Sequence, residues 1–380
     1  MKQNCLLLAC LFCAGTLLGQ SATADKAKAF GRLQFIAEYE IPHDLSYKGT
    51  TVGGLSGIDY DSAHGVYYMI SDDRSAINPA RFYTAKIFFS AKKIDSVSFV
   101  DVTTLLGPDG KPYPNSKQDP RHTPDPEDMR YNPLTDELTW TSEGERIVKA
   151  TDTVLENPAI TRMRRDGRYI DTFPLPSNLL MHATENGPRQ NGVLEGLSFA
   201  KNFTKLYVNV EEPLYEDGPR AGLAPNKPWI RIYRFDVASK KAEAQYAYEL
   251  DPVAYPAVPE DAFKINGIPD ILSVGENKLL VLERSFSTGR QPCTIKIFLA
   301  DLEGADDISR NQSLIKNPPP KPVNKKLLLN MDDLGIYVDN VEGICFGPSL
   351  PNGHKTLLLV ADNNFLAAEK TQFFLFELVP

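Results

Sequence analysis

Val193-Leu-Glu-Gly-Leu-Ser-Phe199 begins the stretch of sequence that decides the fold, and Lys205-Leu-Tyr-Val-Asn-Val-Glu-Glu212 completes it. The pair predicts a short buried strand, a polar turn and a second strand that ends in two carboxylates. Variants of this phrase start near residues 54, 127, 270 and 342, so five copies stand about 70 residues apart. Self-similarity at a regular spacing is typical of repeat architectures.

Two further strands are predicted after each copy of the phrase except the last, which is followed by one. They span Arg81–Phe89 and Ser96–Val102, Ile160–Arg164 and Tyr169–Phe173, Trp229–Val237 and Ala242–Leu250, Thr294–Asp301 and Lys326–Asn330, and finally Gln372–Leu378. Asp166-Gly167 is a strong hairpin turn signal between two of them. No amphipathic helix longer than a turn or two is predicted, so the fold class is all-β.

The strand predicted at Gly31–Pro42 precedes the first repeat and has no hairpin partner of its own. It can supply the fourth strand that the last repeat lacks, which would join the two chain ends and close a ring without open edges. We therefore predict a β-propeller of five blades. Typical blade repeats span ~40–50 residues, so a sixth blade hidden in the long loops is an alternative. A pair of β-sandwiches is the competing fold, but it would not explain why the phrase occurs five times.

Residues 1–24 are predicted to be a secretory signal peptide. Lys2 is basic, Cys5–Leu18 is apolar, and Ala22-Thr-Ala24 offers a small-residue cleavage site. We expect a secreted or periplasmic protein, with residues 25–380 forming a single domain that has no membrane span and is monomeric. Leu7-Leu-Ala-Cys10 comes too early for a lipoprotein anchor.

The formal net charge of −8 argues against binding to nucleic acid. Cys293 and Cys345 are the two cysteines beyond the predicted signal peptide, and we expect them to be separate buried thiols. The chain contains no Gly-x-Ser-x-Gly elbow, no P-loop, no His-Glu-x-x-His and no Cys-x-x-Cys.

Carboxylates recur where the propeller would bring them together. In a blade, the start of the first strand and the end of the second lie at the same mouth of the central channel. The starts carry Glu127, Asp128, Glu195, Asp270 and Glu342, and the ends carry Asp72, Asp73, Arg74, Glu143, Glu145, Glu211, Glu212, Glu283, Arg284, Asp362 and Asn363. Like charges in a narrow channel repel, and all-oxygen ligands favour Ca²⁺ over zinc or copper.

This arrangement predicts a functional site at the acidic mouth. The metal ligands would be Glu127, Glu195, Asp270 and Glu342, and the catalytic group would comprise Glu127, Glu195, Arg74, Arg284 and His182. The arginines would neutralise phosphoryl oxygens, and the histidine could protonate a leaving group. The loops that enter the second and third repeats would add Arg121, Arg189 and Asn191 for substrate binding. Each single glutamate could instead have a purely structural role, in which its carboxylate accepts hydrogen bonds from backbone N–H groups of the neighbouring blade.

Several phrases together resemble a known family. They are Gly54-Leu-Ser-Gly-Ile58, Ser71-Asp-Asp-Arg74, Ala80-Arg-Phe-Tyr83, Asp125-Pro-Glu-Asp128, Asn191-Gly-Val-Leu-Glu-Gly-Leu197 and Asn340-Val-Glu-Gly-Ile344. In order and spacing they are similar to the phytase-like family, also described as "esterase-like activity of phytase", from about Gly31 to the C-terminus. The resemblance implies an exported protein with a propeller-like fold and a phosphomonoesterase or esterase activity, with calcium dependence like that of the propeller phytases.

Three functions remain open at this point. The first is a metal-assisted, calcium-dependent hydrolase of phosphate esters, phytase-, phosphatase- or esterase-like. The second is a non-catalytic propeller that binds a small ligand or a surface partner through its long loops. The third is a lactonase-type calcium propeller that would cleave a cyclic ester at the same metal site.

Overall fold

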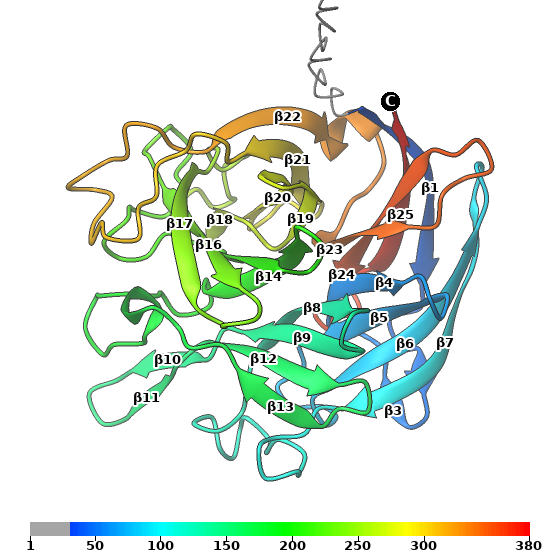
Figure 1. Ribbon diagram of the computed structural model, residues 1–380, viewed down its shortest axis with the longest axis horizontal. Helices are drawn as coiled ribbons and strands as arrows, with labels where there is room; N and C mark the ends of the chain where they lie inside the picture. The colour runs from blue at the N-terminus through cyan, green and yellow to red at the C-terminus, as the bar shows by residue number, and fades with distance from the viewer. Residues whose placement is uncertain (1–30) are drawn as a thin grey trace, which may run out of the picture.

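The computed structural model describes residues 31–380, so the predicted signal peptide lies outside the described residues. Five antiparallel sheets surround a common centre, as Figure 1 shows, and the prediction of a five-bladed β-propeller is confirmed. Residues 31–380 form no sixth blade.

The blades follow the repeats in the sequence, and each inner strand lies next to the central channel. Blade 1 contains β4 (Leu55–Asp61), β5 (Val66–Ser71), β6 (Arg81–Phe89) and β7 (Ile94–Thr104). Blade 2 contains β8 (Pro126–Asn132), β9 (Glu137–Ser142), β12 (Ala159–Arg164) and β13 (Tyr169–Thr172). Blade 3 contains β14 (Leu194–Ala200), β15 (Lys205–Val210), β16 (Trp229–Asp236) and β17 (Ala242–Glu249). In blade 4, both β18 (Lys264–Gly267) and β19 (Ile271–Gly275) pair with β20 (Lys278–Ser287), followed by β21 (Thr294–Asp301) and β22 (Asn324–Asn330).

Blade 5 closes the ring. It combines β23 (Asn340–Gly347), β24 (Lys355–Asp362) and β25 (Thr371–Val379) with β1 (Arg32–Ile41), which pairs antiparallel to β25. The rings of Phe35 and Phe376 pack across this pair with their centroids 5.5 Å apart. The predicted closure by the N-terminal strand is therefore present.

Apolar side chains fill the space between neighbouring blades. One buried cluster joins blades 3 and 4, another joins blades 4 and 5, and two more link blade 1 to blade 5 and to blade 2. Cys293 and Cys345 are free and buried in these layers, as predicted. Because each blade buries both faces against its neighbours, its inner strand is held rigidly at the channel.

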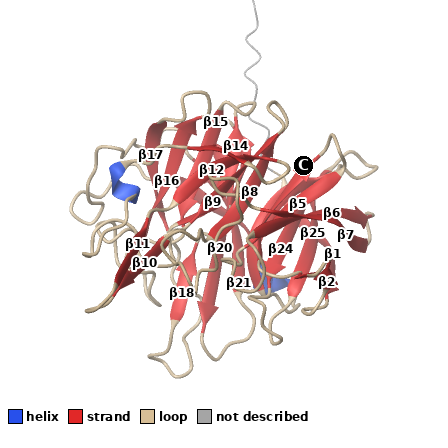
Figure 2. Cartoon of the chain, turned by 90° about the horizontal axis from the view of Figure 1, so that it is seen from below, coloured by secondary structure: helices blue, strands red, loops and turns tan. Residues whose placement is uncertain are grey.

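The loops add small elements that the sequence analysis does not predict. They are the hairpins β2 (Ser46–Tyr47) with β3 (Thr50–Thr51) and β10 (Glu145–Val148) with β11 (Thr153–Glu156), and the short 3-10 helices η1 (Ser177–Leu179) and η2 (Met331–Leu334). Strands dominate the molecule in Figure 2. Among residues 31–380, no helix has the length and apolar character needed to cross a membrane.

Candidate functional site

The pairing of the inner strands is interrupted where the predicted site residues stand. The register shifts lie between Pro126 and Met129 in β8, between Leu194 and Leu197 in β14, and between Val341 and Gly343 in β23. They enclose Glu127, Glu195 and Glu342. A bulge redirects a side chain that would otherwise alternate between the faces of the sheet. The fold thus turns three glutamates from different blades toward the same end of the channel.

Glycines beside these glutamates let the inner strands approach one another closely. A Cβ on Gly57 would lie 2.7 Å from the Cα of Asp128, and one on Gly196 would lie 2.6 Å from the Cα of Asp270. Asp128 accepts a hydrogen bond from the Leu197 amide over 2.9 Å. The two aspartates therefore lie inside the channel, in space that the glycines leave open.

Arg130 connects these aspartates across the centre of the molecule. Its Nη1 donates to Asp128 over 2.9 Å and its Nη2 to both carboxylate oxygens of Asp270 over 2.7 Å. It also donates to the carbonyl oxygens of Ile58 and Ile344. One guanidinium thus joins blades 1, 2, 4 and 5 below the mouth.

A cavity of about 680 Å³ lies at the mouth itself. Nine carboxylates line it, and we call them the acidic mouth: Asp72, Asp125, Glu127, Glu143, Glu195, Glu211, Asp339, Glu342 and Glu369. The basic residues in this lining are Arg220 and Arg284, and it contains no lysine. The predicted gathering of acidic residues from different repeats is therefore present.

Two groups within the acidic mouth have the chemistry of a cation site. One carboxylate oxygen from each of Asp125, Glu127 and Glu143 lies within 4.8 Å of the others, and Glu143, Glu195 and Glu211 form a second such group. All the donors are carboxylate oxygens, which suit a hard cation. No hydrogen bond from residues 31–380 reaches the side-chain carboxylate of Glu127, which leaves its oxygens available.

Burial and mutual repulsion make the ionised forms of these acids costly. Burial, followed by the charges of Glu195, Asp125, Glu143 and Asp72, raises the pKa of Glu127 well above its usual value. Burial, with Glu143 and Glu211 next, does the same to the pKa of Glu195. Burial raises the pKa of Asp125 to about 7, although Arg74 opposes the shift. A bound cation would favour the ionised forms.

Arg284 lies beside the second of these carboxylate groups, because it bonds to Glu211. Its Nη2 donates to Glu211 over 2.5 Å, and its Nη1 donates to Glu342 and, over 2.7 Å, to Asn340. The Nε atom is buried without a hydrogen-bond partner. This guanidinium holds two glutamates from different blades in place.

The structure brings only part of the predicted site together. Glu127, Glu195, Arg284, Glu342 and Asn191 line the same cavity. Arg74 lies just beyond the lining, where it donates to Glu145 over 2.6 Å and its Nε approaches Asp125 at 3.6 Å.

Asp270 does not lie at the mouth, which corrects its predicted place beside the glutamates. It aligns with Asp128 rather than with Glu127, because each of the two aspartates directly precedes the buried apolar residue of its inner strand, Met129 or Ile271. Its oxygens are occupied by Arg130 and by the Ile344 amide.

The predicted loop residues Arg121, His182 and Arg189 are also absent from the cavity lining. Arg121 is exposed and donates to Asp152 over 2.9 Å. The His182 carbonyl accepts from Arg146, and Arg189 donates to the carbonyls of Pro213 and Gly218. These contacts connect loops to one another, so the three residues stabilise the loops around the mouth and do not line the cavity.

An apolar wall beside the acidic mouth is not among the features predicted from the sequence. Phe263, Ile265, Phe286 and Leu366 line the same cavity, and the Phe263 and Phe286 rings lie 6.1 Å apart. Phe263 and Leu366 are 55% and 52% exposed, which is unusual for large apolar side chains beside a cavity. The strand β18, which carries Ile265, lies before the fourth copy of the repeated phrase. The repeat therefore does not predict it.

Comparison with solved structures finds propellers of low similarity. The Dos1 propeller shares 6% identity at a TM-score of 0.35, covering 87% of this chain and 69% of that one. An endo-arabinase from Bacteroides thetaiotaomicron shares 12% identity at a TM-score of 0.45, covering 91% and 98%. A gluconolactonase from Xanthomonas campestris shares 10% identity at a TM-score of 0.34, covering 91% and 96%.

No curated protein matches the sequence. A family model does match, over residues 50–365, which include blades 1 to 4, the strands β23 and β24 of blade 5 and every residue of the acidic mouth except Glu369. Its description is "Phytase-like: Esterase-like activity of phytase". The chain belongs to this phytase-like family.

Proposed function

We propose that this protein is an exported, Ca²⁺-assisted hydrolase of esters, with phosphate monoesters as the first substrate class and the acidic mouth as its site. The observation that carries the proposal is the imbalance of charge in a cavity of about 680 Å³, where nine carboxylates face two arginines. Family membership supports the reaction class. Export rests on the predicted signal peptide.

The residues present fit a hard cation. Glu143, Glu195 and Glu211 would hold it, because they form the fully buried one of the two groups of closely spaced carboxylate oxygens. When bound, the ion would supply positive charge that offsets both the carboxylates and an incoming phosphoryl group. Asp270 is not included, since its oxygens are already occupied.

The chain's own residues then have separate tasks. Arg284 would place its positive charge beside an ester oxygen, since it lines the cavity and its Nε has no hydrogen-bond partner among the described residues. Glu127 is the candidate to accept a proton from the attacking water, because it lines the cavity and no hydrogen bond from the described residues reaches its carboxylate. Asn191 and Gln190 offer polar contacts at the rim.

The lining favours a substrate with one charged group and an apolar part over a polyphosphate. Both arginines of the lining are already paired, Arg284 with Glu211 and Glu342, and Arg220 with Glu212. A polyphosphate would bring several negative charges to a mouth that is itself acidic. The wall of Phe263, Ile265, Phe286 and Leu366 would instead cover an aromatic or acyl group.

The test is hydrolysis of a panel of nitrophenyl phosphates and nitrophenyl carboxylates by the protein, with Ca²⁺ and then with a chelator. We expect chelator-sensitive phosphate release that falls by at least about tenfold in the Glu195→Gln/Glu342→Gln double variant. Lys326→Gln, a substitution at an exposed position of the outermost strand β22, is the control. Unchanged turnover and Ca²⁺ binding in the double variant would disprove the proposal.

The apolar wall also favours a second candidate, an esterase or lactonase that uses the same cation site. Chelator-sensitive cleavage of carboxylate esters without phosphate release would identify it. A non-catalytic binding propeller is the remaining alternative, and the outcome that supports it is saturable ligand binding with no turnover on any member of the panel.

A further inference from the structure

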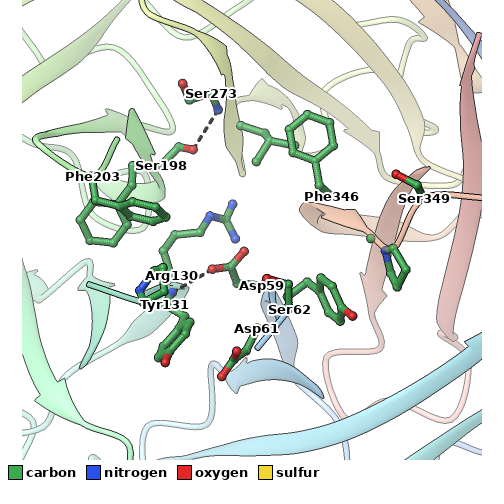
Figure 3. Close-up of a pocket in the computed structure, with 16 residues that line it drawn as sticks. Asp59, Asp61, Ser62, Arg130, Tyr131, Ser198, Phe203, Ser273, Phe346 and Ser349 are labelled. Carbon is green, nitrogen blue, oxygen red and sulfur yellow. Dashed lines mark hydrogen bonds between the residues drawn. The ribbon is translucent and has the colours of Figure 1, made fainter. Parts of the chain in front are cut away.

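The end of the channel opposite the acidic mouth contains a second cavity, of about 520 Å³. We call it the channel cup and define it by Asp59, Tyr60, Tyr131, Phe199, Phe203 and Phe346. With Leu272 from blade 4, every blade contributes to its lining. Figure 3 shows Phe203 and Phe346 on opposite sides of the cup, with Arg130 and Asp59 between them. The volume lies within the range of small-molecule sites, ~300–1,000 Å³.

Asp59 is a carboxylate of this cup without a salt bridge among the described residues, and the positive charge that acts on it is that of Arg130 in the same lining. Its Oδ2 accepts from the Tyr131 amide over 2.8 Å, and no residue of the described chain forms a salt bridge with it. The nearby Arg130 is already shared between Asp128 and Asp270. Three carboxylates thus share one guanidinium, so Asp59 can still be paired with a further positive group that enters the cup.

Aromatic rings surround this carboxylate. Phe199 and Phe203 pack with ring centroids 5.5 Å apart, and Tyr60 packs on Tyr67 at 4.7 Å. The faces of aromatic rings attract cations, most strongly where water is excluded. A carboxylate among such rings is suited to a positively charged group that also carries apolar carbon atoms.

The turn that carries Phe203 has an unusual backbone. Lys201, Asn202 and Phe203 have φ angles of 49°, 53° and 62° between β14 and β15, and all are non-glycine residues. A bulky residue in this region is uncommon and costs ~1–3 kcal/mol, and such strain is concentrated at binding and switch sites. Here it holds the Phe203 ring at the rim of the cup while Phe203 stays partly exposed.

We propose that the channel cup is a binding site for a small organic cation, an alkylated ammonium, with Asp59 as its counter-ion and the rings of Phe199 and Phe203 packed against its carbon atoms. The proposal does not depend on the hydrolase function, because the cup lies at the other end of the channel and shares no lining residue with the acidic mouth.

The probe is tetramethylammonium, with tert-butanol as its neutral near-isostere, and ligand-detected NMR at constant ionic strength measures binding to the whole protein. We expect saturable binding of the ammonium with a dissociation constant at or below ~1 mM, and much weaker binding of tert-butanol. Asp59→Asn should weaken ammonium binding at least tenfold, and Phe203→Ala should weaken it about threefold to tenfold.

Two comparisons keep the result specific to the cup. The Glu195→Gln/Glu342→Gln variant must retain the binding, because loss there would assign the cation to the acidic mouth and overturn the proposal. Ser349→Lys, at an exposed rim position of the cup, should abolish binding by repulsion without a change in the core, so it replaces Asp59→Asn if that variant does not fold. Equal binding of the neutral probe, or no saturable binding at all, also overturns the proposal.

Discussion

At the scale of single residues, the buried carboxylates of the acidic mouth, which we propose to bind a cation, lower the stability of the metal-free protein. Glu195 is 7% exposed, and burial and its acidic neighbours raise its pKa well above the usual value. Its ionised form therefore destabilises the metal-free protein at neutral pH. We expect Glu195→Gln to increase the free energy of unfolding in chelator by about 0.5–2 kcal/mol, while reducing the stabilisation that Ca²⁺ gives. Thermal unfolding with and without Ca²⁺ measures both effects, and a less stable metal-free variant would contradict this account.

The same acids predict how stability depends on pH. Asp125 has a pKa of about 7 in the folded chain, against roughly 3.9 in an unfolded one. Between these values the folded state binds the extra proton, so stability falls as pH rises, by up to about 1.4 kcal/mol per pH unit for one group. Urea unfolding in chelator at pH 5, 6 and 7 should show this decline. Asp125→Asn should flatten the decline, whereas an unchanged slope would exclude Asp125 as its source.

At the scale of elements, the close approach of the inner strands depends on small residues. A Cβ on Gly196 would lie 2.6 Å from the Cα of Asp270 and 2.7 Å from the Ile271 amide nitrogen, and backbone atoms cannot move aside cheaply. We expect Gly196→Ala to cost about 1–3 kcal/mol of unfolding free energy. Gly275→Ala, whose Cβ would have no contact closer than 3.7 Å, is the control and should change stability by less than about 0.5 kcal/mol. Equal effects of the two substitutions would argue against tight strand packing.

The elements also show what the sequence could predict. Strands rich in apolar residues, such as β6 and β21, have the predicted bounds, because these residues are buried against the neighbouring blades on both sides. The hairpin β10–β11 was missed, because its short strands carry little apolar signal. Among the site residues, Glu127, Glu195 and Glu342 could be predicted from their repeated position. Asp270 stands one position later in the repeated phrase than these glutamates, level with Asp128, and its pairing with Arg130 could not be predicted because the two residues are 140 positions apart in the chain.

At the scale of the whole molecule, Arg130 connects four blades through buried bonds. Its side chain is 3% exposed, and it bonds to Asp128 and Asp270, which are 1% and 0% exposed. Arg130→Met would leave two buried carboxylates without their partner, and we expect a loss of about 3–5 kcal/mol in unfolding free energy. Arg165→Met, which breaks an exposed pair with Asp136, should cost less than about 1 kcal/mol. Urea unfolding measures the free energy of unfolding of both variants. A small loss for Arg130→Met would show that the five blades do not depend on the contacts of Arg130 for their stability.

The pairing of β1 with β25 sets the order in which the protein can be completed. β1 comes from residues 32–41, but its partner spans residues 371–379, so the first strand to be synthesised is among the last to be paired. A nascent chain therefore carries unsatisfied strand edges until almost all of it has been made, and such edges are prone to aggregation. Contacts of such long sequence separation also slow folding. The same ring closure that makes the channel of the folded protein rigid therefore leaves the growing chain exposed to aggregation until β25 has been synthesised.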